Sequence, residues 1–247
     1  MIPLRDANPT HRTPVVTLGL IVACLVVFAY QIWLLASDGE DALDAFILAW
    51  GVVPARIDAA WAAGEIVSPA TATLVTSQFL HGGWLHILGN LLYLWIFGNN
   101  IEDRFGRVPF LVFYLAGGVV AGLCQVLIDP TSEVPVVGAS GAIAAILGAY
   151  LVLFPAARIT SLVFLGFFYQ LIDVPAVIVL AFWFVLQVID AITSLGVTDV
   201  TGGVAVFAHV GGFVFGVLVA LVARRLAAPP SPHRQVGGGS VPPAPVG

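Results

Sequence analysis

The sequence GASGAIAAILGAYLVLF, residues 138–154, decides how the rest of this chain is interpreted. It places Ser140 between Gly138 and Gly141, at the start of an apolar segment that continues to Phe154. A serine among small residues at the start of an apolar helix is consistent with a flexible hinge, a close-packed helix surface or an activated nucleophile. The remainder of the chain has to distinguish these three interpretations.

The composition is that of an integral membrane protein. Of the 247 residues, 60% are hydrophobic and only 9% are charged, whereas soluble globular domains are about 45–50% apolar and about 25% charged. The formal net charge is −5, and we expect no nucleic-acid partner for this chain. Both cysteines, Cys24 and Cys124, lie within apolar segments, so we expect small hydrophobic side chains rather than a disulfide framework.

Apolar segments predict an all-α bundle of six membrane-spanning helices, of which the fourth is short. Their expected ranges are 15–36, 84–104, 109–128, 140–154, 174–192 and 203–226. The first range, after an arginine-bearing arm, could also be a secretory signal. Its apolar run continues well past Cys24 and more spans follow, so we expect an uncleaved first helix.

The segments outside these helices differ in character. Residues 37–80 mix acids with tryptophans, which predicts an amphipathic first external loop lying in the membrane interface. Residues 159–171 are apolar and aromatic but interrupted by a glycine, and we expect another interfacial piece. The predicted regions are an unstructured cytoplasmic arm (1–13), a membrane domain (14–227) and a disordered tail rich in Pro and Gly (228–247).

The arginines predict the orientation of the bundle in a cell membrane. The chain has nine basic residues, all arginine, and only Arg56 lies outside the N-terminal arm, the 2–3 loop, the 4–5 loop or the tail. The positive-inside rule places those four regions, and therefore both termini, in the cytoplasm. The 1–2, 3–4 and 5–6 loops then face outward.

Polar residues inside the apolar spans are costly, and they are therefore functional candidates. The second, fourth and sixth helices all begin on the outer side, and each has a polar residue near that beginning. The candidates are His81, His86 and Asn90 with the second helix, Ser140 with the fourth and His209 with the sixth. These groups are expected at one depth near the outer leaflet.

Such a set of side chains can activate a serine. His209 can accept the proton of Ser140, while His86, Asn90 and the unpaired backbone N–H groups of the fourth helix can stabilise an oxyanion. The upper parts of these three helices contain no carboxylate. The residues therefore indicate a Ser–His dyad rather than a triad with aspartate.

Glycines accompany both members of this pair. Gly138 and Gly141 remove side chains where the backbone must approach a substrate. Gly212 and Gly216 share one face of the sixth helix with His209, and such spacing lets another helix approach closely. The fourth helix has a matching face of small residues, so the two helices can pack with the serine beside the histidine.

Taken together, these motifs resemble those of the rhomboid family of intramembrane serine proteases, and the match covers most of the chain. The four motifs, in order, are HGGWLHILGN (81–90), EDR (102–104), GASG (138–141) and AHVGGFVFG (208–216). The resemblance implies a multi-pass serine endopeptidase that cleaves transmembrane segments of other membrane proteins. Ser140 would be its nucleophile, His209 its base, and His86 and Asn90 its oxyanion partners.

The resemblance also implies supporting roles outside this set. His81 would be structural, near the loop that precedes the second helix. Glu102 and Arg104 would stabilise the cytoplasmic end of that helix, although a solvated pair of charges at a helix end explains them equally well. The family works without a metal or other cofactor, and we expect neither here; the lipid bilayer and the substrate are the expected partners.

The sequence departs from the family pattern at two places. Some members have an aromatic residue one turn after the serine, packed on the histidine, where this chain has Ala144. What orients His209 is therefore open, and Trp183 and Phe182 are the candidates. The first loop also lacks a Trp-Arg pair found in parts of the family. Polar residues without an assigned role are Gln31, Gln125, Gln187 and Asp190.

The same residues are consistent with other interpretations. Ser140 alone could be a helix N-cap. His81 and His86 could bind a metal, but the chain lacks His-Glu-x-x-His. A transporter or channel would distribute polar groups through the membrane depth or contain internal repeats. A non-proteolytic rhomboid-like protein that binds client helices usually lacks the serine or the histidine, and this chain has both.

Overall fold

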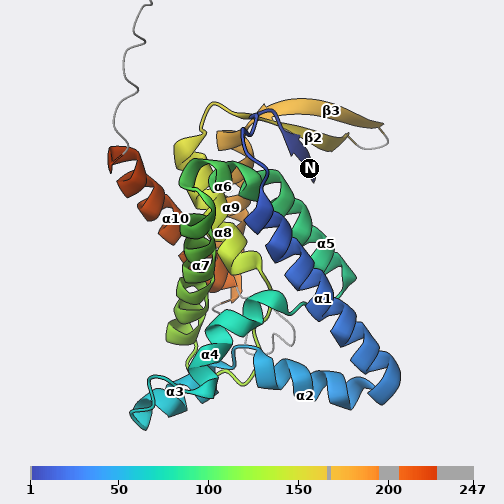
Figure 1. The fold of residues 1–247 in the computed structure, drawn as a ribbon, viewed down its shortest axis with the longest axis vertical. Helices are drawn as coiled ribbons and strands as arrows, with labels where there is room; N and C mark the ends of the chain where they lie inside the picture. The colour runs from blue at the N-terminus through green and yellow to red at the C-terminus, as the bar shows by residue number, and fades with distance from the viewer. Residues whose placement is uncertain (1, 166–167, 195–205, 227–247) are drawn as a thin grey trace, which may run out of the picture.

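The computed structural model describes residues 2–165, 168–194 and 206–226, which form a helical bundle with a small sheet across one end (Figure 1). The chain is mostly helical, as predicted. The helices are α1 (Val15–Asp38), α2 (Glu40–Trp50), α3 (Pro54–Ala62), α4 (Pro69–Thr76), η1 (Ser77–Phe79), α5 (Trp84–Tyr93), η2 (Leu94–Gly98), α6 (Asn99–Phe105), α7 (Arg107–Ile128), α8 (Ser140–Leu153), α9 (Ala176–Ser194) and α10 (Val206–Leu226).

The apolar helices agree with a membrane protein. Among the described residues, α1, α7 and α10 are long and apolar enough to cross a bilayer. The apolar stretches of α8 and α9 are shorter. α5, η2 and α6 follow one another without a break from 84 to 105, with a π-helical turn in the middle. The number of spans, predicted as six, stays a prediction.

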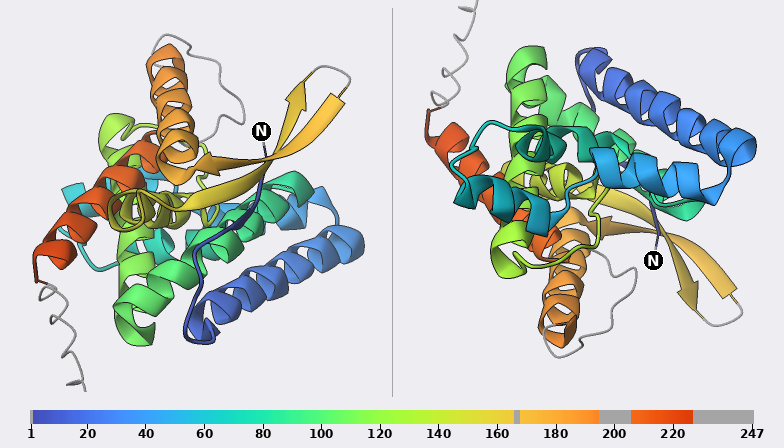
Figure 2. Two further views of the ribbon diagram at one scale, coloured as in Figure 1. Left: turned by 90° about the horizontal axis from the view of Figure 1, so that it is seen from above. Right: turned by 90° about the horizontal axis from the view of Figure 1, so that it is seen from below.

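α8 lies at the centre of the bundle because its side chains are small enough for its neighbours to approach. Residues 141–150 are all buried, and α10, α7 and η2 pack directly against this helix. The views along the bundle show α8 near the centre (Figure 2). A Cβ atom on Gly212 would overlap the carbonyl group of Gly141, and one on Gly216 would overlap that of Ala145. α8 and α10 are therefore in backbone contact.

A three-stranded antiparallel sheet covers the end of the bundle at which α1 begins (Figure 1). Its strands, in spatial order, are β1 (Ile2–Asp6), β2 (Arg158–Leu165) and β3 (Phe168–Pro175). Ile2 pairs with Leu162, and the β2–β3 hairpin is in register from Arg158 opposite Pro175 to Leu165 opposite Phe168. The prediction of an unstructured arm is therefore wrong for residues 2–6, because pairing with a distant hairpin orders them.

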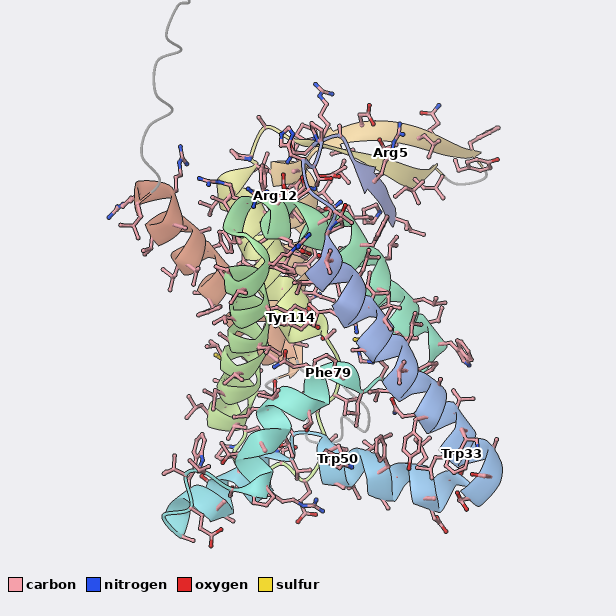
Figure 3. The ribbon with its side chains drawn as sticks, in the orientation of Figure 1. Arg5, Arg12, Trp33, Trp50, Phe79 and Tyr114 are labelled. Atoms are coloured by element: carbon pink, nitrogen blue, oxygen red, sulfur yellow. The ribbon has the colours of Figure 1, made fainter. Side chains whose placement is uncertain are left out.

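The acidic segment 37–80 folds into α2, α3, α4 and η1 at the opposite end from the sheet (Figure 1). Val52 and Val136 exchange two backbone hydrogen bonds, of 3.0 and 2.7 Å, which join this segment to the loop before α8. Arg5 and Arg12 lie at the sheet end of the molecule, whereas Trp33 and Trp50 lie at the far end (Figure 3).

Two predicted segments fall largely beyond the described residues. The tail predicted at 228–247 lies outside them, and so does the 5–6 loop apart from Thr193 and Ser194.

Candidate active site

Ser140 is the first residue of α8 and lies inside the bundle. α7 has 22 residues and α8 has 14, so at about 1.5 Å per residue they are about 33 and 21 Å long. Both helices have one end at the sheet side of the molecule (Figure 1). Because α8 is the shorter helix and both have an end at the sheet side, Ser140 lies within the bundle rather than at its far end (Figure 1).

His209, in the first turns of α10, faces this serine. The Nε2 atom of His209 lies 2.7 Å from the Oγ atom of Ser140, and the histidine is 8% exposed. This contact depends on the close approach of α10 to α8, which the missing side chain of Gly212 permits. The packing of α10 on α8 therefore places the serine hydroxyl group at hydrogen-bond distance from an imidazole nitrogen.

The other ring nitrogen of His209 faces α9. Its Nδ1 atom lies 2.7 Å from the Oε1 atom of Gln187, a residue for which sequence reasoning found no role. The ring of Trp183, one turn earlier on α9, has its centroid 6.0 Å from that of His209, with 41° between the planes. Among the described residues, no carboxylate hydrogen-bonds to His209.

His86 and Asn90 lie beside the loop that leads into α8. Gly138 in this loop has φ +125°, and a Cβ atom there would lie 2.7 Å from Nε2 of His86 and 3.5 Å from Nδ2 of Asn90. The N–H of Gly82 donates to Nδ1 of His86 at 3.3 Å. Nε2 of His86 therefore carries the ring proton and is a donor next to the loop.

Further donors face the same region. Nδ2 of Asn90 is buried and has no hydrogen-bond partner among the described residues. The first bond of α8 runs from the N–H of Ile143 to the carbonyl of Ala139 (2.9 Å). The earlier N–H groups of the helix have no intrahelical partner, and they lie at the positive end of the helix dipole. The site therefore presents several donors close to one serine.

His81 lies next to His86, but its backbone is hydrogen-bonded to α1. Its backbone N–H and carbonyl are both paired with the side-chain amide of Gln31 on α1, at 3.1 and 3.0 Å. Its ring lies edge-on to that of His86, with centroids 5.3 Å apart. These bonds fix the loop before α5, on which His86 depends for its position.

Glu102 lies far from Ser140, at the sheet end of the bundle. Its carboxylate accepts hydrogen bonds from the N–H of Val16 (2.9 Å) and from both the N–H and the hydroxyl of Thr17 (2.7 Å each). It therefore caps the N-terminus of α1, where a negative charge also meets the helix dipole. Arg104, which sequence reasoning grouped with it, is exposed.

An open cleft of about 1370 Å³ connects Ser140 and His209 with the hydrogen-bond donors around them. Its lining includes Ser140, His209, His86, Asn90 and Trp183. The cleft is large enough to admit an extended peptide segment to the serine. A hydroxyl paired with an imidazole and surrounded by hydrogen-bond donors is suited to acyl transfer.

Comparison with known proteins finds one family across this region. The Rhomboid domain matches residues 69–226, well over half of the chain. The chain is 41% identical over 75 residues to Rhomboid-like protein 11, chloroplastic, of Arabidopsis thaliana, covering 30% of this chain and 26% of the relative. It is 40% identical over 78 residues to Rhomboid protease GluP of Bacillus subtilis, covering 32% and 15%.

A longer match is to Presenilin-associated rhomboid-like protein A, mitochondrial, of Danio rerio. The identity is 30% over 159 residues, covering 61% of this chain and 38% of the relative. The chain thus spans well under half the length of each of these three relatives.

Proposed function

Because the chain belongs to the rhomboid family, we propose that it is an intramembrane serine endopeptidase that cleaves transmembrane segments of other membrane proteins. The observation that carries this proposal is the 2.7 Å contact between Nε2 of His209 and Oγ of Ser140. A family relative named as a protease, GluP, agrees with it. The reaction needs no cofactor, because every group it uses is a side chain or backbone amide of this chain.

In the proposed reaction, Oγ of Ser140 attacks the carbonyl carbon of the scissile peptide bond, and Nε2 of His209 takes the hydroxyl proton. The carbonyl oxygen becomes an oxyanion, which Nε2–H of His86, Nδ2 of Asn90 and the backbone at Gly141 stabilise. His209 then gives its proton to the leaving amine. Water, activated by the same histidine, hydrolyses the acyl-enzyme and releases the second product.

The substrate segment has to unwind before it can react. In an intact helix every backbone carbonyl is hydrogen-bonded, and a bilayer offers no water to replace those bonds. Segments with small or helix-breaking residues at the depth of Ser140 are therefore the favoured substrates. The open cleft supplies a route for water, with α9 as the element that moves to admit substrate.

The proposed setting is a multi-pass protein of the cell membrane with six spans and both termini in the cytoplasm. Arg5, Arg12, Arg104 and Arg107 support this orientation, because they belong to segments at the sheet end of the bundle and the positive-inside rule places such segments in the cytoplasm. The site then opens toward the outer leaflet.

Cleavage of a single-span test substrate in detergent tests the proposal. Wild type should cleave it, while Ser140→Ala and His209→Ala should lose the activity and keep the fold. Ser37→Ala and His11→Ala are matched controls, because both residues are exposed and lie away from the cleft. If Ser140→Ala cleaves as fast as wild type, the proposal is wrong. Binding of intact substrate by a wild type that never cleaves it would indicate a client-binding protein instead.

A further inference from the structure

We infer that Gln187 is the positioning residue for His209, holding the imidazole in the tautomer and orientation that the reaction needs. The inference rests on the proposed function and adds a third member to the Ser140–His209 pair. It also answers the question that Ala144 raises, because the group that orients the histidine comes from α9 rather than from α8.

The two nitrogens of the His209 ring are both engaged. Nδ1 lies 2.7 Å from Oε1 of Gln187, and Nε2 lies 2.7 Å from Oγ of Ser140. A carbonyl oxygen only accepts hydrogen bonds, so Nδ1 must carry the ring proton. The lone pair is then on Nε2, where it can accept the proton of the serine hydroxyl. The amide thus selects the reactive tautomer.

In the part of the chain that the structure describes, no other neighbour of His209 can do the same. Ala144, one turn after the serine, has only a methyl group. Trp183 lies beside the imidazole at 6.0 Å between centroids, with the rings tilted by 41°, but its indole N–H is only a donor and gives Nδ1 no acceptor. Phe182 is 56% exposed.

The packing of α9 against α10 places the side-chain amide of Gln187 beside the ring of His209. Trp183 and Gln187 are one turn apart on the same face of α9. Phe213, one turn after His209 on α10, stacks against Phe184 at 4.3 Å and lies 6.1 Å from Trp183. These aromatic contacts hold the two helices together one turn away from the Gln187–His209 hydrogen bond, so the geometry of that bond is set by the helix interface.

Three variants of the chain test the inference. Gln187→Leu keeps the size but removes the acceptor, Gln187→Glu keeps an acceptor and adds charge, and Leu186→Ala is a control on an exposed neighbour. The readouts are kcat and KM for a test substrate, the pH–rate profile, and the rate at which a fluorophosphonate labels Ser140.

Gln187→Leu is expected to lower kcat and the labelling rate by about 10–100-fold, with KM within about twofold, because the wrong tautomer predominates. Gln187→Glu should recover most of the activity. Its carboxylate stabilises the imidazolium, so the acidic limb of the pH–rate profile should move to higher pH. Leu186→Ala should behave as wild type. A merely structural role for Gln187 would produce neither the recovery nor the moved limb.

Several results would overturn the inference. Labelling of Gln187→Leu at the wild-type rate would do so, and so would equal inactivity of the Leu and Glu variants. A second measurement covers a variant that fails to fold: ¹⁵N NMR of the wild-type His209 ring, assigned by comparison with His209→Ala, must find the proton on Nδ1. Failure of the proposed function is distinguishable, because wild-type Ser140 would then take up no label.

Discussion

Removing the carboxylate of Glu102 should destabilise the protein strongly without touching the chemistry at Ser140. The side chain is 3% exposed and accepts three hydrogen bonds from Val16 and Thr17, at 2.7–2.9 Å. Hydrogen bonds to a charged group contribute about 1.5–3 kcal/mol each but are not additive, and the helix dipole adds up to about 2 kcal/mol. We expect Glu102→Ala to cost about 4 kcal/mol of unfolding free energy.

For a chain of this size, about 4 kcal/mol corresponds to a fall of about 8–16 °C in the thermal midpoint. The assay is a thermal melt in one detergent, followed by intrinsic fluorescence. Asp103→Asn is the matched control, because the hydrogen bond that Asp103 accepts from the N–H of His11 (3.0 Å) is exposed, and it should shift the midpoint by less than about 2 °C. Glu102→Gln should lose at least half as much as Glu102→Ala, since its NH₂ group faces the donors of α1.

Below its melting temperature, Glu102→Ala should cleave a test substrate at the wild-type rate, because the carboxylate lies at the sheet end and the serine lies in the cleft. A midpoint within 2 °C of wild type would refute the capping role. Loss of activity in a fully folded variant would refute the separation of this carboxylate from the chemistry.

Three further perturbations have defined outcomes. Gly138→Ala places a Cβ atom 2.7 Å from Nε2 of His86 at a φ of +125°, so cleavage should fall about 100-fold; wild-type cleavage would contradict this. Gly212→Val makes α8 and α10 overlap and should cost about 3 kcal/mol; an unchanged thermal midpoint would show that the helices do not touch there. Burial raises the pKa of the Asp6 carboxyl above its ordinary value of 3.8. Its stabilising contribution is therefore complete below that value and lost as pH rises through the raised pKa. Asp6→Asn should flatten this decline in melts between pH 4 and pH 7, and an equally steep decline in the variant would exclude Asp6 as its source.

Local sequence signals predicted the helices well. Pro14 precedes α1, the end of the glycine run at Gly83 precedes α5, and Ser140 begins α8, each within two residues of the predicted start. Such boundaries follow from residues next to them in the chain. The juxtaposition of Ser140 and His209 was also predictable, because small residues at helical spacing mark the faces that approach each other. The roles of these two residues stay predictions.

The sheet could not be predicted in the same way. The pairing of Ile2 with Leu162 joins residues far apart in the chain, and neither segment has the alternation that identifies a half-buried strand. The apolar run from Ile159 resembles an interfacial helix as closely as it resembles a hairpin. Asp6, which accepts a bond of 2.7 Å from the hydroxyl of Tyr150, gains its partner only from the three-dimensional fold.

The contact of Gln187 with His209 was missed for a related reason. A polar side chain in the middle of an apolar span is a functional candidate by default, so a signal was present. Helical periodicity places Gln187 on the same face as Trp183, but it does not say which neighbouring helix that face meets. Only the packing of α9 on α10 supplies the partner.

Whether Ser140 is the nucleophile is tested by identifying the residue that a fluorophosphonate modifies. The protein in detergent is treated with the probe and digested, and the labelled peptide is sequenced by mass spectrometry. A single modification is expected, on Ser140, that is abolished in Ser140→Ala and strongly slowed in His209→Ala. A label on any other residue, or labelling that persists in Ser140→Ala, would contradict it.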